Sequence, residues 1–169
     1  GILDKSGRFI NDDVAQLNFP KIASRLFSLE SEERIFILHG TREDPLIYLS
    51  QRDVRELQFA KASIATGWKL LLEQLNIEEE EIQQVLLAGS FGSYLSPASA
   101  ITIGLVPKLP VLRIVSAGNV AGEGAKMVLL SQPERNGALT LLKEVDYVEL
   151  SDRSDFNDKF VEQLAFPVA

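Results

Sequence analysis

The fold is decided by one stretch, Val85-Leu86-Leu87-Ala88-Gly89-Ser90-Phe91-Gly92. Its small and apolar first half predicts a buried strand, and its two glycines predict a sharp stop where the backbone comes close to a neighbour. That neighbour is most often a phosphate or a nucleotide, because amides without a nearby Cβ approach an anion closely. A second turn of small residues, Gly118-Asn119-Val120-Ala121-Gly122, follows about one strand and one loop later. Two such turns in one short chain predict half of a nucleotide cleft.

Each glycine turn also has a plainer interpretation. Glycine at a strand end often serves tight packing alone, and for Gly89–Gly92 ligand contact and packing are evenly balanced. The stretch is no P-loop, because no Gly-Lys-Ser/Thr follows it, and it lacks the G-x-G-x-x-G dinucleotide fingerprint. Close helix packing is expected at the second turn in either case, and a tight turn before a helix also exposes free amides.

A long helix is predicted over residues 50–76, where apolar residues recur at helical spacing. Ser50 is the expected N-cap, with the Asp53 carboxylate in the first turn. Polar Gln58 and Lys61 fall on one stripe of this helix, followed by Ala62 and Ala65 on the same stripe. The polar pair could accept a ribose and the small pair a flat base. From spacing alone a solvated helix face is the favoured interpretation.

The remaining signals give the coarse order of elements. We expect further strands over residues 34–39, 46–49, 84–88, 112–115 and 145–150, the first two pairing as a hairpin. We expect further helices over residues 21–30, 119–130, 133–143 and 156–164, and one that begins at Ser96-Pro97. Residues 1–20 are expected to be an irregular lead-in.

Length, charge and composition limit the functions that this chain can have. A length of 169 residues predicts a single domain, and a net charge of −7 makes nucleic acid a poor partner. The absence of cysteine excludes disulfides, thiol catalysis and a thiolate-held iron–sulfur cluster in this chain, and the lone His39 excludes a multi-histidine metal site. No apolar run approaches a membrane span, so a cytoplasmic protein without a membrane partner is expected. The start at Gly1 without methionine suggests a trimmed chain. No catalytic residue and no metal ligand stands out by spacing.

Several segments carry a family resemblance, in order along most of the chain. They are Gly1–Asp4, Tyr48–Ala62, Leu86–Leu95, Ile103–Pro107, Ser116–Ala125 and Phe156–Pro167. Together they resemble the ATP-dependent reductive activators of corrinoid proteins, which belong to the superfamily of acetate and sugar kinases, heat-shock chaperones and actin. The resemblance implies an α/β fold, a ribonuclease-H-like (actin-like ATPase) lobe with a central mixed sheet flanked by helices. Residues 1–169 would be one domain, the C-terminal lobe of a two-lobed ATPase.

The same resemblance implies a function for the longer protein. ATP with magnesium would help to drive the reduction of a cobalt(II) corrinoid protein to cobalt(I) for methyl transfer. A two-iron two-sulfur cluster would sit in an N-terminal ferredoxin-type domain outside this chain. The corrinoid protein is the expected partner, and a homodimer is left open. The isolated chain is expected to hydrolyse nothing, because the phosphate loop and the magnesium-handling acid would lie upstream.

Site residues follow from the family motif. The adenosine motif would be Gly89, Ser90, Phe91 and Gly92, with Ser90 in place of one of two adjacent glycines, and Gly118 and Asn119 would lie in the second connecting segment. Gln58 and Lys61 would contact the ribose, with Ala62 and Ala65 near the base. Two alternatives stay open: a docking or dimerisation module without catalysis, and an actin-like kinase or dehydratase-activator relative.

Overall fold

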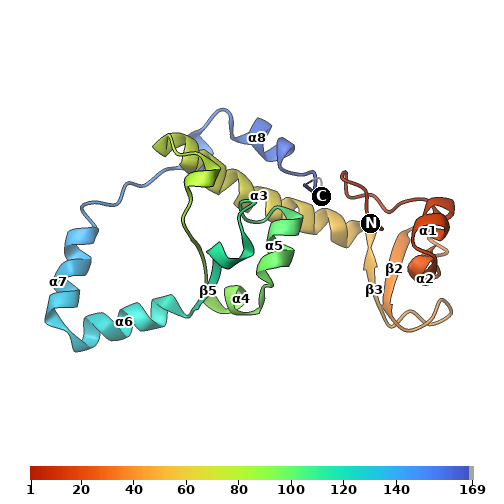
Figure 1. Cartoon of the computed structure of the whole chain (residues 1–169), viewed down its shortest axis with the longest axis horizontal. Coiled ribbons are helices and arrows are strands. Elements are labelled where there is room, and N and C mark those ends of the chain that lie inside the picture. Colours follow the sequence, from red (N-terminus) through yellow and green to blue (C-terminus); the bar gives the residue numbers. More distant parts are fainter. Residues whose placement is uncertain (168–169) are drawn as a thin grey trace. The chain divides into compact units, whose positions relative to one another are not determined.

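The computed structural model describes residues 1–167, apart from the side chains of Phe91 and Ser151 (Figure 1). Contacts between Cα atoms divide the chain into two compact units. The first unit comprises Gly1–Thr66 and the chain from Asn157 onward, and the second comprises Gly67–Phe156. The mixed α/β class predicted from the sequence is confirmed. Its strands form two sheets, one of three antiparallel strands and one of two parallel strands, where a single central sheet was expected.

The first unit is built on the antiparallel sheet. Strands β1 (Leu26–Ser28), β2 (Arg34–His39) and β3 (Ile47–Ser50) pair in that order, and the predicted hairpin is the β2–β3 pair. The run from Arg34 to His39 forms a strand because its β-branched and aromatic side chains suit a pleated, half-buried surface. Short helices α1 (Asp12–Asn18) and α2 (Pro20–Ala23) precede the sheet. Their sequences were predicted as an irregular lead-in and a longer helix over 21–30, and both predictions are wrong in extent.

Helix α3 (Gln51–Leu75) contributes residues to both units, and its ends were well predicted. The Ser50 hydroxyl accepts a hydrogen bond from the Asp53 amide at 3.1 Å, and the Asp53 carboxylate accepts one from the Ser50 amide at 2.8 Å. These reciprocal bonds satisfy amides that the first turn leaves unpaired. The hydrogen bonds from the Ser50 amide and hydroxyl also hold the pKa of Asp53 below its ordinary value. At the other end Asn76 takes a left-handed φ of 53° and stops the helix.

The second unit is built on the parallel pair of β4 (Val85–Ala88) and β5 (Ile114–Gly118). Helices α4 (Gly89–Tyr94), α5 (Pro97–Ile103), α6 (Val120–Leu130) and α7 (Gln132–Leu141) follow these strands. The last helix, α8 (Phe156–Glu162), belongs to the first unit apart from its first residue. Single 3₁₀ turns lie at η1 (Glu79–Glu81), η2 (Val111–Arg113) and η3 (Leu150–Asp152). A small core joins Ala100, Val106, Leu109 and Ile114.

Two expectations fail in the second unit. Residues 145–150 form no strand, since Val145 and Tyr147 are 62% and 83% exposed and no described strand pairs with them. Their apolar alternation therefore marks no buried face. Strand β4 was expected to be covered on both sides, yet Leu86 is 59% exposed. A parallel sheet is normally buried on both faces, so this one lacks part of its cover in the described chain.

Candidate functional site

The two glycine turns lie side by side, at the carboxyl ends of the paired parallel strands. Ala88 is the register partner of Gly118, and Gly89 follows Ala88 directly. Helix α4 starts from the first turn and contacts both strands (Figure 1). The edge beyond the carboxyl ends of parallel strands is where open α/β sheets bind their ligands. The structure therefore brings Gly89–Gly92 and Gly118–Asn119 together at one sheet edge.

The backbone conformation at Gly89 and Gly118 favours glycine. Both take a left-handed φ, +86° and +65°, which other residues rarely adopt. A Cβ placed on either would meet no atom within 4 Å, so the space above each backbone is open. Gly92 differs, because its Cβ would lie 2.4 Å from the Leu87 carbonyl oxygen. Tight packing thus explains Gly92, whereas Gly89 and Gly118 leave open backbone that a ligand can approach.

The polar groups at this edge are few. Ser90 and Asn119 are exposed, and the side chain of Phe91 lies outside the described part of the structure. The Asn119 side chain caps α6, its Oδ1 accepting from the Gly122 amide at 3.0 Å. One of the amides predicted to be free at the second turn is therefore already paired. What remains is open backbone with an exposed hydroxyl beside it, a surface suited to binding and without a group for acid–base chemistry.

The stripe on α3 is buried, so it is not the solvated face that spacing favoured. Gln58 and Lys61 are each 2% exposed, and Ala62 and Ala65 are 0% and 1% exposed. The Gln58 amide nitrogen donates to the Leu164 carbonyl at 2.7 Å, and the Lys61 ammonium donates to the Ala165 carbonyl.

The partner of this stripe is the C-terminal segment, which the sequence analysis missed. The Lys61 ammonium also lies 5.5 Å from the centroid of the Phe166 ring, and that ring packs against the core of the first unit. The Phe166 amide donates to the Lys5 carbonyl at 2.8 Å. We call this arrangement of residues 164–166 on Gln58 and Lys61 the tail clasp. The only signal for it was a pair of long polar side chains on an otherwise small-residue stripe.

A tight loop near the N-terminus completes the tail clasp. The Gln58 amide nitrogen donates to the Ser6 carbonyl at 3.1 Å, and a Cβ on Gly7 would lie 2.4 Å from Gln58 Oε1. The Asp4 carboxylate braces this loop by accepting from the Ser6 hydroxyl at 2.7 Å and from the Arg8 amide at 3.0 Å. These bonds hold the pKa of Asp4 below its ordinary value. The loop, the tail and the stripe are thus one local assembly.

Thr66 is a further polar residue that the sequence analysis did not single out. It is fully buried, and its Oγ1 has no hydrogen-bond partner among the described residues. A buried hydroxyl is normally paired. In the sequence of α3, Thr66 comes four residues after Ala62, so it lies one turn along from that residue.

The ten predicted site residues therefore form two groups, one in each unit. Gly89–Gly92 and Gly118–Asn119 belong to the second unit, and Gln58, Lys61, Ala62 and Ala65 belong to the first. Within each group the residues lie near one another, at one sheet edge in the second unit and on one stripe of α3 in the first. Nucleotide contact at either group stays a prediction.

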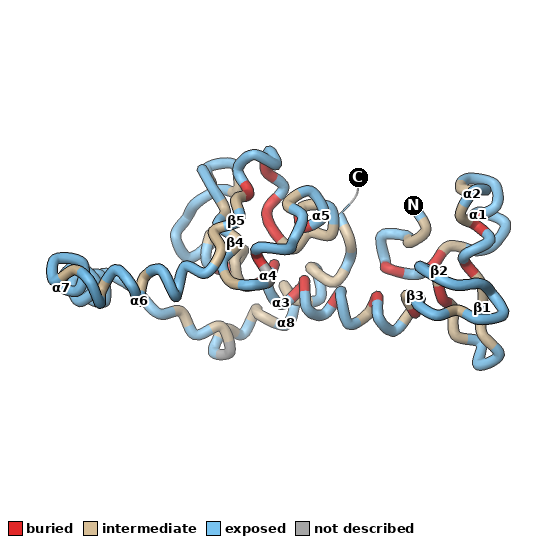
Figure 2. Tube along the Cα trace, turned by 90° about the horizontal axis from the view of Figure 1, so that it is seen from below, coloured by how far each residue is buried: buried red, intermediate tan, exposed pale blue. Residues whose placement is uncertain are grey.

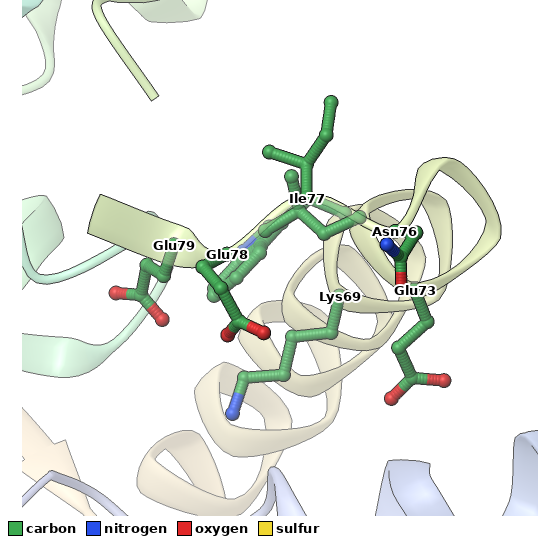
Figure 3. Close-up of a pocket in the computed structure, with 8 residues that line it drawn as sticks. Lys69, Glu73, Asn76, Ile77, Glu78 and Glu79 are labelled. Atoms are coloured by element: carbon green, nitrogen blue, oxygen red, sulfur yellow. The ribbon is translucent and has the colours of Figure 1, made fainter. Parts of the chain in front are cut away.

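A separate hollow of about 330 Å³ lies along the last turns of α3 (Figure 3). Lys69 and Glu73 line it from the helix, and Glu78 and Glu79 line it from the segment that follows. Glu79 accepts a hydrogen bond from the Lys108 amide, while Glu78 takes part in the capping box of η1. The carboxylates of Glu73, Glu78 and Glu79 make this hollow unfavourable for a phosphate. The contacts of Glu78 and Glu79 stabilise the acidic turn itself.

Within residues 1–167 no three metal-ligating side chains of the His, Cys, Asp and Glu types come together. Over the same residues, none of the helices combines the length and the hydropathy that crossing a bilayer demands.

Comparison with known proteins places this geometry in a family. The family model described as the C-terminal domain of RACo, the ASKHA domain, matches residues 1–169. A corrinoid activation enzyme, RamQ of Eubacterium limosum, is 32% identical over 169 residues, covering 98% of this chain and 28% of its own length. A reductase of a Co(II) methylated amine-specific corrinoid protein from Methanosarcina barkeri is 22% identical over 124 residues, covering 72% of this chain and 23% of its own.

A solved structure agrees with these relatives. The structure of a reductive activator for a corrinoid, iron–sulfur protein superposes with a TM-score of 0.77 at 30% identity, covering 99% of this chain and 26% of that one. This chain thus spans about a quarter of the length of the relatives that it matches. The family resemblance stated from the sequence motifs is confirmed. The chain belongs to the family of the C-terminal ASKHA domain of RACo.

Proposed function

We propose that this chain is the C-terminal nucleotide-binding lobe of an ATP-dependent reductive activator, which reduces cobalt(II) corrinoid proteins to cobalt(I) for methyl transfer. One observation carries the proposal most directly. Two left-handed glycines, Gly89 and Gly118, stand beside each other at the ends of paired parallel strands, with open space above both. This arrangement occurs in a chain that matches an ASKHA domain along its whole length.

The lobe would bind rather than react. Adenosine would lie against the open backbone of Gly89 and Gly118, with the Ser90 hydroxyl at its edge. Acidic residues of the other lobe would hold magnesium, which would supply positive charge at the phosphates. The isolated chain would therefore hydrolyse no ATP. The arrangement of its strands would be ribonuclease-H-like once the rest of the ATPase domain is present, with residues 1–169 as one lobe.

Contact of the α3 stripe with a nucleotide is a second part of the proposal. Gln58 and Lys61 would bind the ribose only if they exchanged the carbonyls of Leu164 and Ala165 for ribose hydroxyls. The buried small side chains of Ala62 and Ala65 would then face the base. This part is independent of the glycine turns and can fail alone.

The iron–sulfur cluster and the corrinoid partner belong to the longer protein. With no cysteine, this chain cannot hold the cluster, which would reside in another domain of a cytoplasmic activator. The corrinoid protein would be the electron acceptor.

The test uses the full-length activator and the substitution Ser90→Trp. This change adds bulk next to the open backbone of Gly89 without replacing the glycine. We expect ATP affinity, measured by calorimetric titration, to fall at least tenfold, and ATP-driven corrinoid reduction to fall with it. Gly124→Ala is the matched control, because its added Cβ meets no atom within 4 Å on the neighbouring helix α6. ATP binding by Ser90→Trp equal to that of the control would contradict the nucleotide site.

A further inference from the structure

Helices α6 and α7 follow each other directly, with a change of direction at Ser131 (Figure 1). The two helices contact each other, and neither contains a buried residue (Figure 2). Large apolar side chains are nevertheless abundant on this segment. Those with high exposure are Met127, Leu129, Leu130, Leu139, Leu141, Leu142 and Val145. We call residues 120–145 the apolar arm.

Several polar groups of the apolar arm pair with one another. Lys126 and Glu123 pair at 2.8 Å, and the Arg135 guanidinium donates twice to the Val128 carbonyl, at 3.0 and 2.9 Å. The Ser131 hydroxyl caps α7 by accepting from the Glu134 amide at 3.4 Å. Local polar contacts thus hold the junction of α6 and α7, whereas the leucines of the apolar arm remain exposed. Paired charges of both signs also argue against a nucleic acid or an anionic membrane as the partner.

Two adjacent helices with so many exposed large apolar side chains are unusual in a folded protein that has no partner for them. Helices of 11 and 10 residues are marginal in water and normally depend on packing of an apolar face. Large apolar side chains that gather in the exposed part of one segment mark an interaction surface. The exposed Leu86 of β4 belongs to the same unit and lacks cover on a parallel sheet, which is normally covered on both faces.

We propose that the apolar arm docks onto the remaining ATPase domain within the same polypeptide, which also covers β4. This proposal rests on the proposed function for the identity of that domain. The matched relatives are roughly four times as long as this chain, since it covers 28% and 26% of two of them. The solved relative keeps the same fold over 99% of this chain within that longer polypeptide. A parallel sheet is normally covered by helices of its own polypeptide, and here the exposed Leu86 of β4 lacks such cover. This favours the same polypeptide over a second copy of the chain as the partner of the apolar arm.

Met127 is a built-in reporter, because it is the only methionine of the 169 residues and is 51% exposed on α6. The full-length activator is treated with dilute hydrogen peroxide, and sulfoxide formation at Met127 is followed by peptide mass spectrometry. We expect oxidation at least tenfold slower than in a synthetic peptide of residues 119–143. The rate should not change on dilution, with the molecular mass followed by light scattering.

A substitution sharpens the reporter. Leu130→Asp replaces a side chain that is 80% exposed on α6, and should raise the rate at Met127 toward that of the peptide. The control Leu17→Asp replaces an equally exposed leucine, at 82%, in the other unit and should leave the rate unchanged. The comparison of the unsubstituted protein with the peptide needs no variant, so it stands even if Leu130→Asp fails to fold.

Two results would overturn the proposal. Oxidation of Met127 at the peptide rate in the full-length protein would show the apolar arm to be open. Protection that is lost on dilution together with dimer mass would assign the surface to a second copy. ATP titration of the same samples separates the two proposals. Bound ATP with an unprotected Met127 overturns the docking alone, whereas absent ATP binding with a protected Met127 overturns the proposed function alone.

Discussion

The tail clasp on α3 and the apolar arm are opposites in composition and burial. On α3 the long polar side chains of Gln58 and Lys61 are almost fully buried, because residues 164–166 and the loop near Ser6 supply carbonyl partners. On the apolar arm leucines are exposed, because no described element packs on them. The difference teaches that burial depends on which segments of the chain return to a helix, and less on the residues of the helix itself.

The largest effect is expected from a matched pair of glutamine substitutions. Gln58→Ala would leave the Ser6 and Leu164 carbonyls without their donor and open a small cavity, at a cost of about 2–3 kcal/mol in the free energy of opening of α3. Gln132→Ala on the apolar arm removes one exposed hydrogen bond to Asn136 and should cost about 0.5 kcal/mol or less. Native-state hydrogen exchange of the helix amides measures both. Equal losses in the two helices would erase the contrast.

Helix caps give a second, smaller contrast. Ser50 caps α3 through reciprocal bonds and is 6% exposed, so Ser50→Ala should lower local stability by about 1–2 kcal/mol. Ser131 caps α7 through one longer bond of 3.4 Å, so Ser131→Ala should cost about 0.5 kcal/mol. Exchange of amides in the first turn of each helix is the measurement. A larger loss at α7 would mean that the arm depends on its cap more than the geometry indicates.

Local signals explain what could be predicted. The hairpin of β2 and β3, the capping of α3 by Ser50 and the helix start at Ser96-Pro97 each depend on residues a few positions apart, and all three are found. From the presence of two glycine turns, half of a nucleotide cleft was predicted. The structure brings both turns to one sheet edge, and nucleotide contact there stays a prediction.

Non-local contacts explain what could not be predicted. The hydrogen bond from Gln58 to the Leu164 carbonyl joins residues 106 positions apart, and no pattern in either segment announces it. Periodicity placed Gln58 and Lys61 on one stripe but could not tell which segment would cover it. The strand predicted over 145–150 failed for the same reason, because an alternating pattern needs a neighbouring strand that the described chain does not supply.

The smallest effect concerns pH and Asp53, whose pKa is lowered by the Ser50 amide and hydroxyl. A carboxylate with a lowered pKa contributes stability above the ordinary value of about 3.9, and that contribution disappears as pH falls through the folded-state value. Asp53→Asn keeps the shape but cannot titrate. We therefore expect the stability of α3 in the parent to fall toward that of Asp53→Asn as the pH drops below about 4. Hydrogen exchange along a pH series tests this, and parallel curves for the two proteins would show that the reciprocal cap carries no charge-dependent part.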